Sequence, residues 1–138
     1  MPHPVTLDAA AMAAGATARA AFVRGLGAAC RDEGFLLLQN HAIPADLCNA
    51  VLADAAAFFA RPAADKERLH ISHSTNHRGF SRMRNSRDWR EQLHFACEWP
   101  EGAWSPGKPD HYRLAGGNPW PDDVFADTLL RYMAAVQA

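Results

Sequence analysis

The chain has 138 residues, with 14 basic and 15 acidic side chains and 49% hydrophobic residues. This composition excludes a disordered chain, and the length allows one globular core without a second domain of ordinary size. The net charge of −1 argues against binding to nucleic acid or to an anionic membrane through overall charge.

The cysteines and the N-terminus indicate a reducing compartment. Cys30, Cys48 and Cys97 are odd in number and form no C-x-x-C pair, so we expect buried, reduced thiols without disulfides or a zinc ribbon. No basic segment opens the chain, and the alanine-rich run 9–18 is too short and too weakly apolar to span a bilayer. We therefore expect a cytoplasmic protein with no membrane partner.

The first 40 residues predict a strand, a helix and a second strand. Residues 5–7 form a short apolar segment, and apolar residues then recur along 22–30 with the period of a helix that Gly34 ends. Residues 35–39 are apolar at successive positions, which is typical of a strand buried on both faces. We expect the helix to pack against this strand.

A second helix is predicted after Pro44, which suits the first turn of a helix. Its apolar stripe continues to Phe59, and Pro62 ends it. The charged residues 65–68 predict a turn, and the polar run 72–76 predicts a loop.

The remaining chain predicts a strand, an irregular connection and a last helix. Residues 92–98 alternate between apolar and polar side chains, which indicates a half-buried strand. Residues 99–121 are rich in Pro and Gly, and the acidic pair Asp122 and Asp123 suits a helix N-terminus. Since no stop signal closes that helix, we expect the chain to end within it, at about 122–138. The elements together predict an α+β fold with helices packed on a few strands.

Five short motifs follow one another in a specific order. They are Gly34-Phe35 with a strand and Asn40-His41-Ala42-Ile43-Pro44; Phe58-Phe59 with Pro62 and Lys66; His77-Arg78-Gly79-Phe80; Asp88-Trp89-Arg90-Glu91; and Asn118-Pro119-Trp120-Pro121. This series resembles the N-terminal region of isopenicillin N synthase-like, Fe(II)- and 2-oxoglutarate-dependent oxygenases, the non-haem dioxygenase N-terminal domain. Ala42 stands where that family usually has Gly, and Phe80 where it has Tyr.

The resemblance implies a fold and a role for the chain. Residues 1–138 would be the N-terminal portion of a double-stranded β-helix (jelly-roll) oxygenase, without its catalytic barrel. The complete enzyme would couple oxidative decarboxylation of 2-oxoglutarate to oxidation of a small-molecule substrate. The downstream catalytic barrel would be the partner of this chain.

The family's iron is held by an H-x-D/E motif and a distal histidine, which leaves open positions on the metal. The residues two positions after the seven histidines are Val5, Ile43, Ser72, Thr75, Gly79, Ala96 and Arg113, none of which is acidic. We therefore expect no catalytic residue, no metal and no cofactor in this chain. Fe(II) and 2-oxoglutarate would belong to the complete family enzyme, and this chain alone would be inactive.

Three histidines have a spacing that could place them on one side of a helix. His70, His73 and His77 follow an i, i+3, i+7 pattern, which could align imidazoles for a metal. The intervening Ser, Thr and Asn residues favour turns instead of a helix. Solvated loop histidines are therefore the preferred interpretation.

Residues 78–90 form a basic stretch on an otherwise neutral chain. Its five arginines outnumber Asp88 and Glu91 by 5 − 2 = 3 charges. Composition alone leaves a solvated loop or a site for a carboxylate-bearing molecule. Nucleic acid is disfavoured because no recognition helix or RNA-binding motif accompanies the arginines.

Two interpretations of the basic stretch differ in function. The resemblance implies that Arg78, Phe80 and Arg82 bind substrate, and loss of Arg78 is then expected to weaken binding with little effect on stability. The alternative is a freestanding binding or interaction module that uses the basic loop 78–90 for an anionic ligand or partner. We also expect self-association, because the strand at 35–39 needs covering layers that a short chain does not fully supply.

Overall fold

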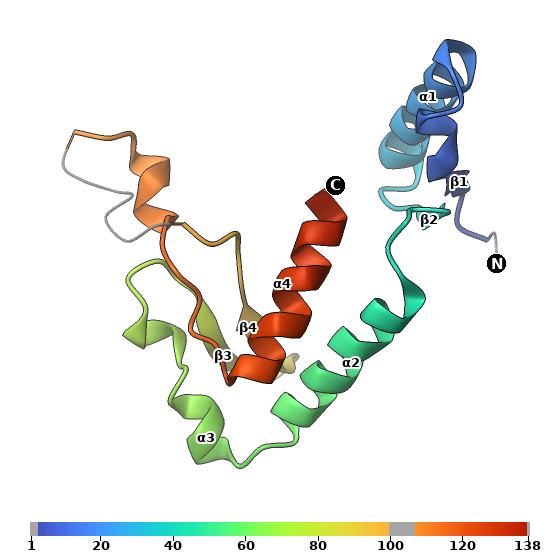
Figure 1. The fold of residues 1–138 in the computed structure, drawn as a ribbon. Helices are drawn as coiled ribbons and strands as arrows, with labels where there is room; N and C mark the ends of the chain where they lie inside the picture. The colour runs from blue at the N-terminus through green and yellow to red at the C-terminus, as the bar shows by residue number, and fades with distance from the viewer. Residues whose placement is uncertain (1–2, 100–106, 138) are drawn as a thin grey trace. The chain divides into compact units, whose positions relative to one another are not determined.

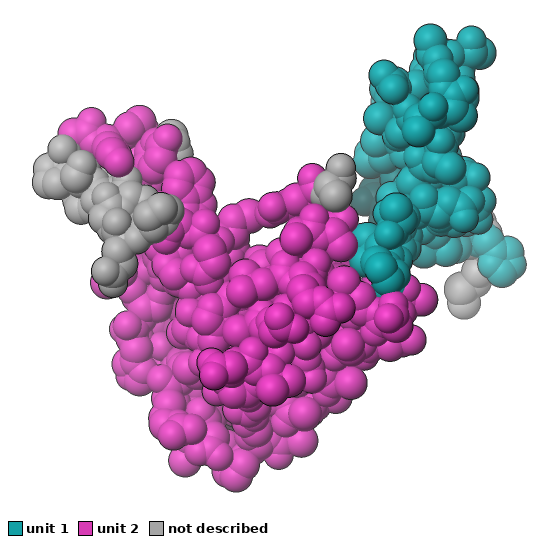
Figure 2. Space-filling model, in the orientation of Figure 1, with its two compact units in different colours: residues 1–44 teal, residues 45–138 magenta. Residues whose placement is uncertain are grey.

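The computed structural model describes residues 3–99 and 107–137, in a chain that has two compact units, Met1–Pro44 and Ala45–Ala138. Figure 1 shows the elements and Figure 2 colours the two units separately. In the described part of the chain, helices accompany two small sheets, and no closed barrel is present. None of the described helices combines the length and hydropathy that a membrane crossing needs.

The first unit is built from two short parallel strands joined by a helix. β1 (Thr6–Asp8) pairs with β2 (Leu37–Gln39), and α1 (Ala16–Asp32) connects them. The helix lies close to β1, since a Cβ added at Gly25 would be 3.2 Å from Leu7 Cδ2. At the end of α1, Gly34 takes a φ of 80° and donates its N–H to the carbonyl oxygen of Ala29, as a helix stop requires. The predicted strand, helix and stop are confirmed.

The surface of β2 differs from the prediction. The segment was expected to be buried on both faces, but Phe35 is 60% exposed and both Leu37 and Leu38 are exposed. The prediction of burial is wrong for the described chain, because α1 and β1 leave the apolar side chains of this segment open to solvent.

The described residues of the second unit form three α-helices and an antiparallel hairpin. α2 (Ala45–Phe59) packs against α4 (Asp123–Gln137), and α3 (Ala63–Glu67) is a short helix after α2. β3 (Gly79–Arg84) pairs with β4 (Trp89–His94) in a register that runs from Gly79 opposite His94 to Arg84 opposite Trp89. Short 3₁₀ helices cover Ile71–His73 and Asp110–Leu114.

The core of this unit is aromatic and joins three elements. Phe58 of α2, Phe80 of β3 and Phe125 of α4 are buried, and the Phe58 ring centroid lies 6.2 Å from each of the other two. Such edge-to-face contacts add about 0.5–1.5 kcal/mol per pair to the burial of the rings. Beside them, Phe95 stacks on Trp120 with centroids 4.8 Å apart.

The chain between α2 and β4 corrects several predictions. Residues 78–90 are not a basic loop, since most of them form the β3–β4 hairpin. The strand predicted at 92–98 begins at Trp89 and ends at His94, and the turn predicted at 65–68 lies mostly in α3. In the predicted irregular connection 99–121, residues 100–106 lie outside the described residues.

The predicted burial of the cysteines is also wrong, although all three are free thiols. Cys30 and Cys97 are exposed, and Cys48 is only partly buried. Cys30 lies at the end of the apolar series 22–30 that predicted the first helix, but its position on α1 faces solvent.

The start of α4 depends on a carboxylate. Asp122 Oδ1 accepts a hydrogen bond from the Phe125 N–H at 2.9 Å, and Oδ2 forms an ion pair with Arg61 near the end of α2. The Phe125 N–H, followed by Arg61, lowers the pKa of Asp122 below its ordinary value of 3.8. The predicted acidic N-terminus of the last helix therefore also connects it to α2.

Asp122→Asn should reduce the acid sensitivity of the fold. Because the folded-state pKa of Asp122 is depressed, its contribution is fully present above its ordinary pKa and is lost as the pH falls through the lower folded value. We expect the free energy of unfolding of the wild type to fall more steeply below about pH 4 than that of the variant. Urea unfolding across this range measures both slopes, and Asp123→Asn is the matched control. Equal slopes for wild type and Asp122→Asn would contradict the assignment.

The exposed segment around β2 should drive self-association. Phe35 and Leu37 leave apolar area in water beside the open edges of a two-stranded sheet. We expect the mass measured by light scattering to rise across a concentration series, and Phe35→Ser with Leu37→Ser to suppress that rise. Val23→Ser, at an exposed position of α1, is the control. A monomer at every concentration would show that this surface does not associate.

Candidate functional site

The start of β3 is fixed by a close backbone contact. The Phe80 N–H donates to the Leu69 carbonyl oxygen at 2.7 Å, and His70 forms an isolated bridge with Phe80. Gly79 takes a φ of 116°, and a Cβ at this position would lie 2.3 Å from the Leu69 carbonyl oxygen. Only glycine allows the two segments to approach so closely, and the contact fixes the direction in which Arg78 leaves the strand.

Arg78 is buried and connects two distant segments. The residue is only 4% exposed. Its guanidinium donates to the carbonyl oxygens of Gly116 and Leu114 and to Asn118 Oδ1. Its backbone N–H donates to Ser74 Oγ at 3.1 Å. The residue therefore joins the chain before β3 to residues 114–118, which follow it by 36–40 positions.

Asn118 continues this network to the chain after β4. Its side chain accepts from the Ala96 N–H at 3.0 Å and donates to the Ala96 carbonyl oxygen at 2.7 Å. It also donates to Glu98 Oε1 at 2.8 Å. On the other side, the buried Asn76 donates to the Gly117 carbonyl oxygen at 3.1 Å. Hydrogen bonds from side-chain amides thus join these segments, in place of the backbone hydrogen bonds that a β-sheet would supply.

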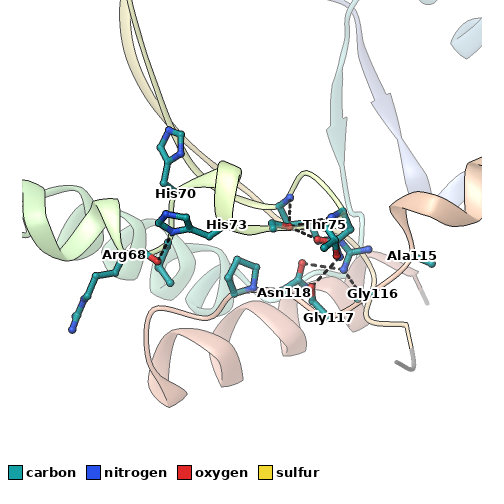
Figure 3. Close-up of a pocket in the computed structure, with 13 residues that line it drawn as sticks. Arg68, His70, His73, Thr75, Ala115, Gly116, Gly117 and Asn118 are labelled. Carbon is teal, nitrogen blue, oxygen red and sulfur yellow. Dashed lines mark hydrogen bonds between the residues drawn. The ribbon is translucent and has the colours of Figure 1, made fainter. Parts of the chain in front are cut away.

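A hollow of about 380 Å³ lies beside this network. It is lined by Arg68, Leu69, His70, His73, Ser74, Thr75, Asn76, Arg78, Ala115, Gly116, Gly117, Asn118 and Pro119. Figure 3 shows His70 and His73 at one end, with Gly116, Gly117 and Asn118 at the other, and the Arg68 side chain directed away from both groups. We define this space as the Arg78 hollow. It is the candidate site, because buried polar groups and imidazoles meet there.

The three residues expected to bind substrate lie in different surroundings. Arg78 lines the Arg78 hollow, whereas Phe80 lies in the aromatic core. Arg82 forms ion pairs with Glu67 and, at 3.8 Å, with Glu91. The interpretation of Arg78 as a solvated loop residue is wrong, but the substrate-binding role of the three residues stays a prediction.

Glu91 of β4 forms ion pairs with two cationic side chains, Lys66 and Arg82. It accepts a hydrogen bond from Lys66 Nζ at 2.7 Å, and Lys66 is buried and also donates to the Phe59 carbonyl oxygen. A buried lysine paired in this way is a structural contact between α3 and β4. Glu91 therefore holds Lys66 and Arg82 and makes no contact with Arg78.

The donor set of the described residues does not fit an iron site. Across residues 3–99 and 107–137, no group of three or more His, Cys, Asp or Glu side chains is arranged to hold a metal ion. The His70 and His73 rings lie edge to face with centroids 6.2 Å apart, and His70 Nδ1 contacts Ser72. The histidines belong to a 3₁₀ turn and its flanks, so the helical alignment that a metal would need does not form.

Sequence reasoning missed two residues of this site. Asn76 and Asn118 make the hydrogen bonds that close the Arg78 hollow, yet Asn76 was assigned only to a polar loop. The motif Asn118-Pro119-Trp120-Pro121 did contain a signal for Asn118. Its partners could not be identified from that motif, because they lie about 20 and 40 residues away in the chain.

Comparison with known proteins assigns the chain to a family. The family described as "non-haem dioxygenase in morphine synthesis N-terminal" matches residues 6–123. The chain belongs to this family, which confirms the resemblance seen in its motifs.

Three relatives illustrate the match. The 2-oxoglutarate-dependent dioxygenase frbJ of Dothideomycetidae sp. (strain 11243) is 32% identical over 121 residues, which cover 80% of this chain and 32% of the relative. Flavanone 3-dioxygenase 2 of Oryza sativa subsp. japonica is 33% identical over 95 residues, or 59% of this chain and 28% of the relative. Homoarginine-6-hydroxylase 2-ODD-C23.2 of Arabidopsis thaliana is 29% identical over 116 residues, or 78% and 31%. The chain spans about a third of the length of these relatives.

Arg78→Ala should destabilise the second unit, contrary to the expectation of little effect. The change removes three hydrogen bonds from a buried guanidinium and takes this donor from the Leu114 carbonyl oxygen. The other two acceptors keep one donor each, the Trp99 N–H for the Gly116 carbonyl oxygen and the Ala96 N–H for Asn118 Oδ1. We expect a loss of about 2–4 kcal/mol in the free energy of unfolding, measured by urea titration. Arg87→Ala, at an exposed position, should change it by less than about 0.5 kcal/mol. A similar small effect for Arg78→Ala would show that the contacts contribute nothing to the fold.

Proposed function

We propose that the chain is the N-terminal, substrate-facing and supporting module of an Fe(II)- and 2-oxoglutarate-dependent dioxygenase that oxidises a small molecule. The observation that carries the proposal is the family match across residues 6–123, together with relatives named as 2-oxoglutarate-dependent dioxygenases. The module would pack against a downstream jelly-roll barrel, in the cytoplasm. The comparisons give no support to a freestanding binding module.

The division of roles follows from the residues present. The complete enzyme would convert 2-oxoglutarate and dioxygen into succinate and carbon dioxide while it oxidises the substrate. Because the described residues do not fit a metal site, the iron and 2-oxoglutarate would be held by the downstream part. This chain would form one wall of the substrate-binding site and would contact one part of the substrate.

Arg78, Phe80 and Arg82 would contribute differently to that wall. The guanidinium of Arg78 has five N–H groups, of which three are used within the chain, and the other two would donate to a substrate carboxylate. Phe80 would act by anchoring β3 in the aromatic core. Arg82 would hold α3 against the hairpin through Glu67 and Glu91, and so would position the wall.

The test is the coding sequence downstream of Ala138 and the activity of the product. We expect an H-x-D motif, a distal histidine and an R-x-S pair there, and succinate formation with Fe(II), 2-oxoglutarate and substrate once that region is joined to this chain. The 138-residue chain alone should form no succinate. The control replaces the histidine of the H-x-D motif by alanine in the joined protein. Succinate formation by the short chain, or a coding sequence without these motifs, would overturn the proposal.

A further inference from the structure

Among the residues that the structure describes, no carboxylate forms an ion pair with Arg78. All three acceptors of its guanidinium are neutral oxygens, two from the backbone and one from Asn118. The carboxylate of Glu98 is separated from it by the Asn118 side chain, to which Glu98 is bonded. A buried cation without an anionic partner is costly, and buried charges are normally paired. The guanidinium therefore favours an anion beside it.

The Arg78 hollow provides space for such an anion, and no acidic side chain in its lining would repel it. Among its lining residues Arg78 carries positive charge, and none is Asp or Glu. Arg68 also lines the hollow, but its side chain is directed away and pairs with Asp65. Ser74, Thr75 and Asn76 add hydroxyl and amide groups to the same lining. Its volume of about 380 Å³ is in the range of pockets for small ligands.

The two histidines present nitrogen atoms that the chain does not use. His70 Nδ1 lies 3.2 Å from the Ser72 N–H and accepts from it, so the neutral ring carries its proton on Nε2 and can donate it. His73 Nδ1 faces the Arg68 carbonyl oxygen at 3.4 Å, and among the described residues its Nε2 makes no hydrogen bond.

We propose that the Arg78 hollow binds the carboxylate or phosphate group of a small molecule, with Arg78 at one end and His70 and His73 at the other. The inference rests on the proposed role of Arg78 as a ligand contact, and it adds the two histidines and the chemical class of the bound group. It does not require oxygenase activity. Oxyanions accept several hydrogen bonds at once, which matches a lining of cationic and neutral donors.

The experiment is isothermal titration of the 138-residue chain with inorganic phosphate and, separately, with malonate. We expect saturable binding of at least one probe, and His70→Gln with His73→Gln should weaken it about tenfold or more. These side chains are partly or fully exposed, so the melting temperature of the double variant should match that of the wild type. Binding of only one probe identifies a phosphate or a carboxylate group, and binding of both supports the shared chemistry.

Matched controls separate a built site from general surface charge. Arg87→Gln removes a charge outside the hollow, and His41→Gln removes an imidazole from the first unit, so neither should change the affinity. No binding of either probe, or equal affinity in wild type and in the histidine double variant, would overturn the inference. If the joined enzyme forms succinate but the chain binds neither probe, the anion site is contradicted and the oxygenase proposal stands. If the chain binds a probe but the joined enzyme forms no succinate, the oxygenase proposal is contradicted and the anion site stands.

Discussion

The buried guanidinium of Arg78 is the contact on which the organisation of the second unit depends. Residues 114–118 form neither a strand nor a long helix, so their carbonyl groups need donors from elsewhere in the fold. Arg78 supplies two of these hydrogen bonds, and a third to the side-chain oxygen of Asn118, from a single rigid, planar group. Arginine suits this position because a lysine has a point charge and no fork that reaches several acceptors in one plane.

The position of Arg78 is itself determined by its neighbours in sequence. Gly79 allows β3 to touch the Leu69 carbonyl oxygen, and Phe80 enters the aromatic core beside Phe58. Three successive residues thus have three physical roles, which are a long-range hydrogen-bond donor, a close backbone contact and a core anchor. This explains why a short motif can be specific even though it contains no catalytic group.

The three long helices could be predicted from the sequence, but α3, the strand β3 and the network could not. The period of apolar residues indicated α1, α2 and α4, because each helix has a face that repeats over several turns. β3 was missed since only Gly79 and Phe80 of this strand are buried, and its arginines gave the segment the composition of a solvated loop. The partners of Arg78 lie 36–40 residues away, and a charge pattern carries no information about such contacts.

The bonds of Asn118 to Ala96 and Glu98 bring together the two ends of the segment that lies between them, and the Trp99 N–H reinforces this closure by donating to the Gly116 carbonyl oxygen. Both ends are therefore fixed by residues outside the segment, independently of its content. The entropy of closing such a segment grows only with the logarithm of its length, by about 0.6 kcal/mol for each doubling. Insertions and deletions after Trp99 and before Leu114 would leave the aromatic core and the Arg78 contacts in place, so related chains can diversify here while the surrounding architecture stays unchanged.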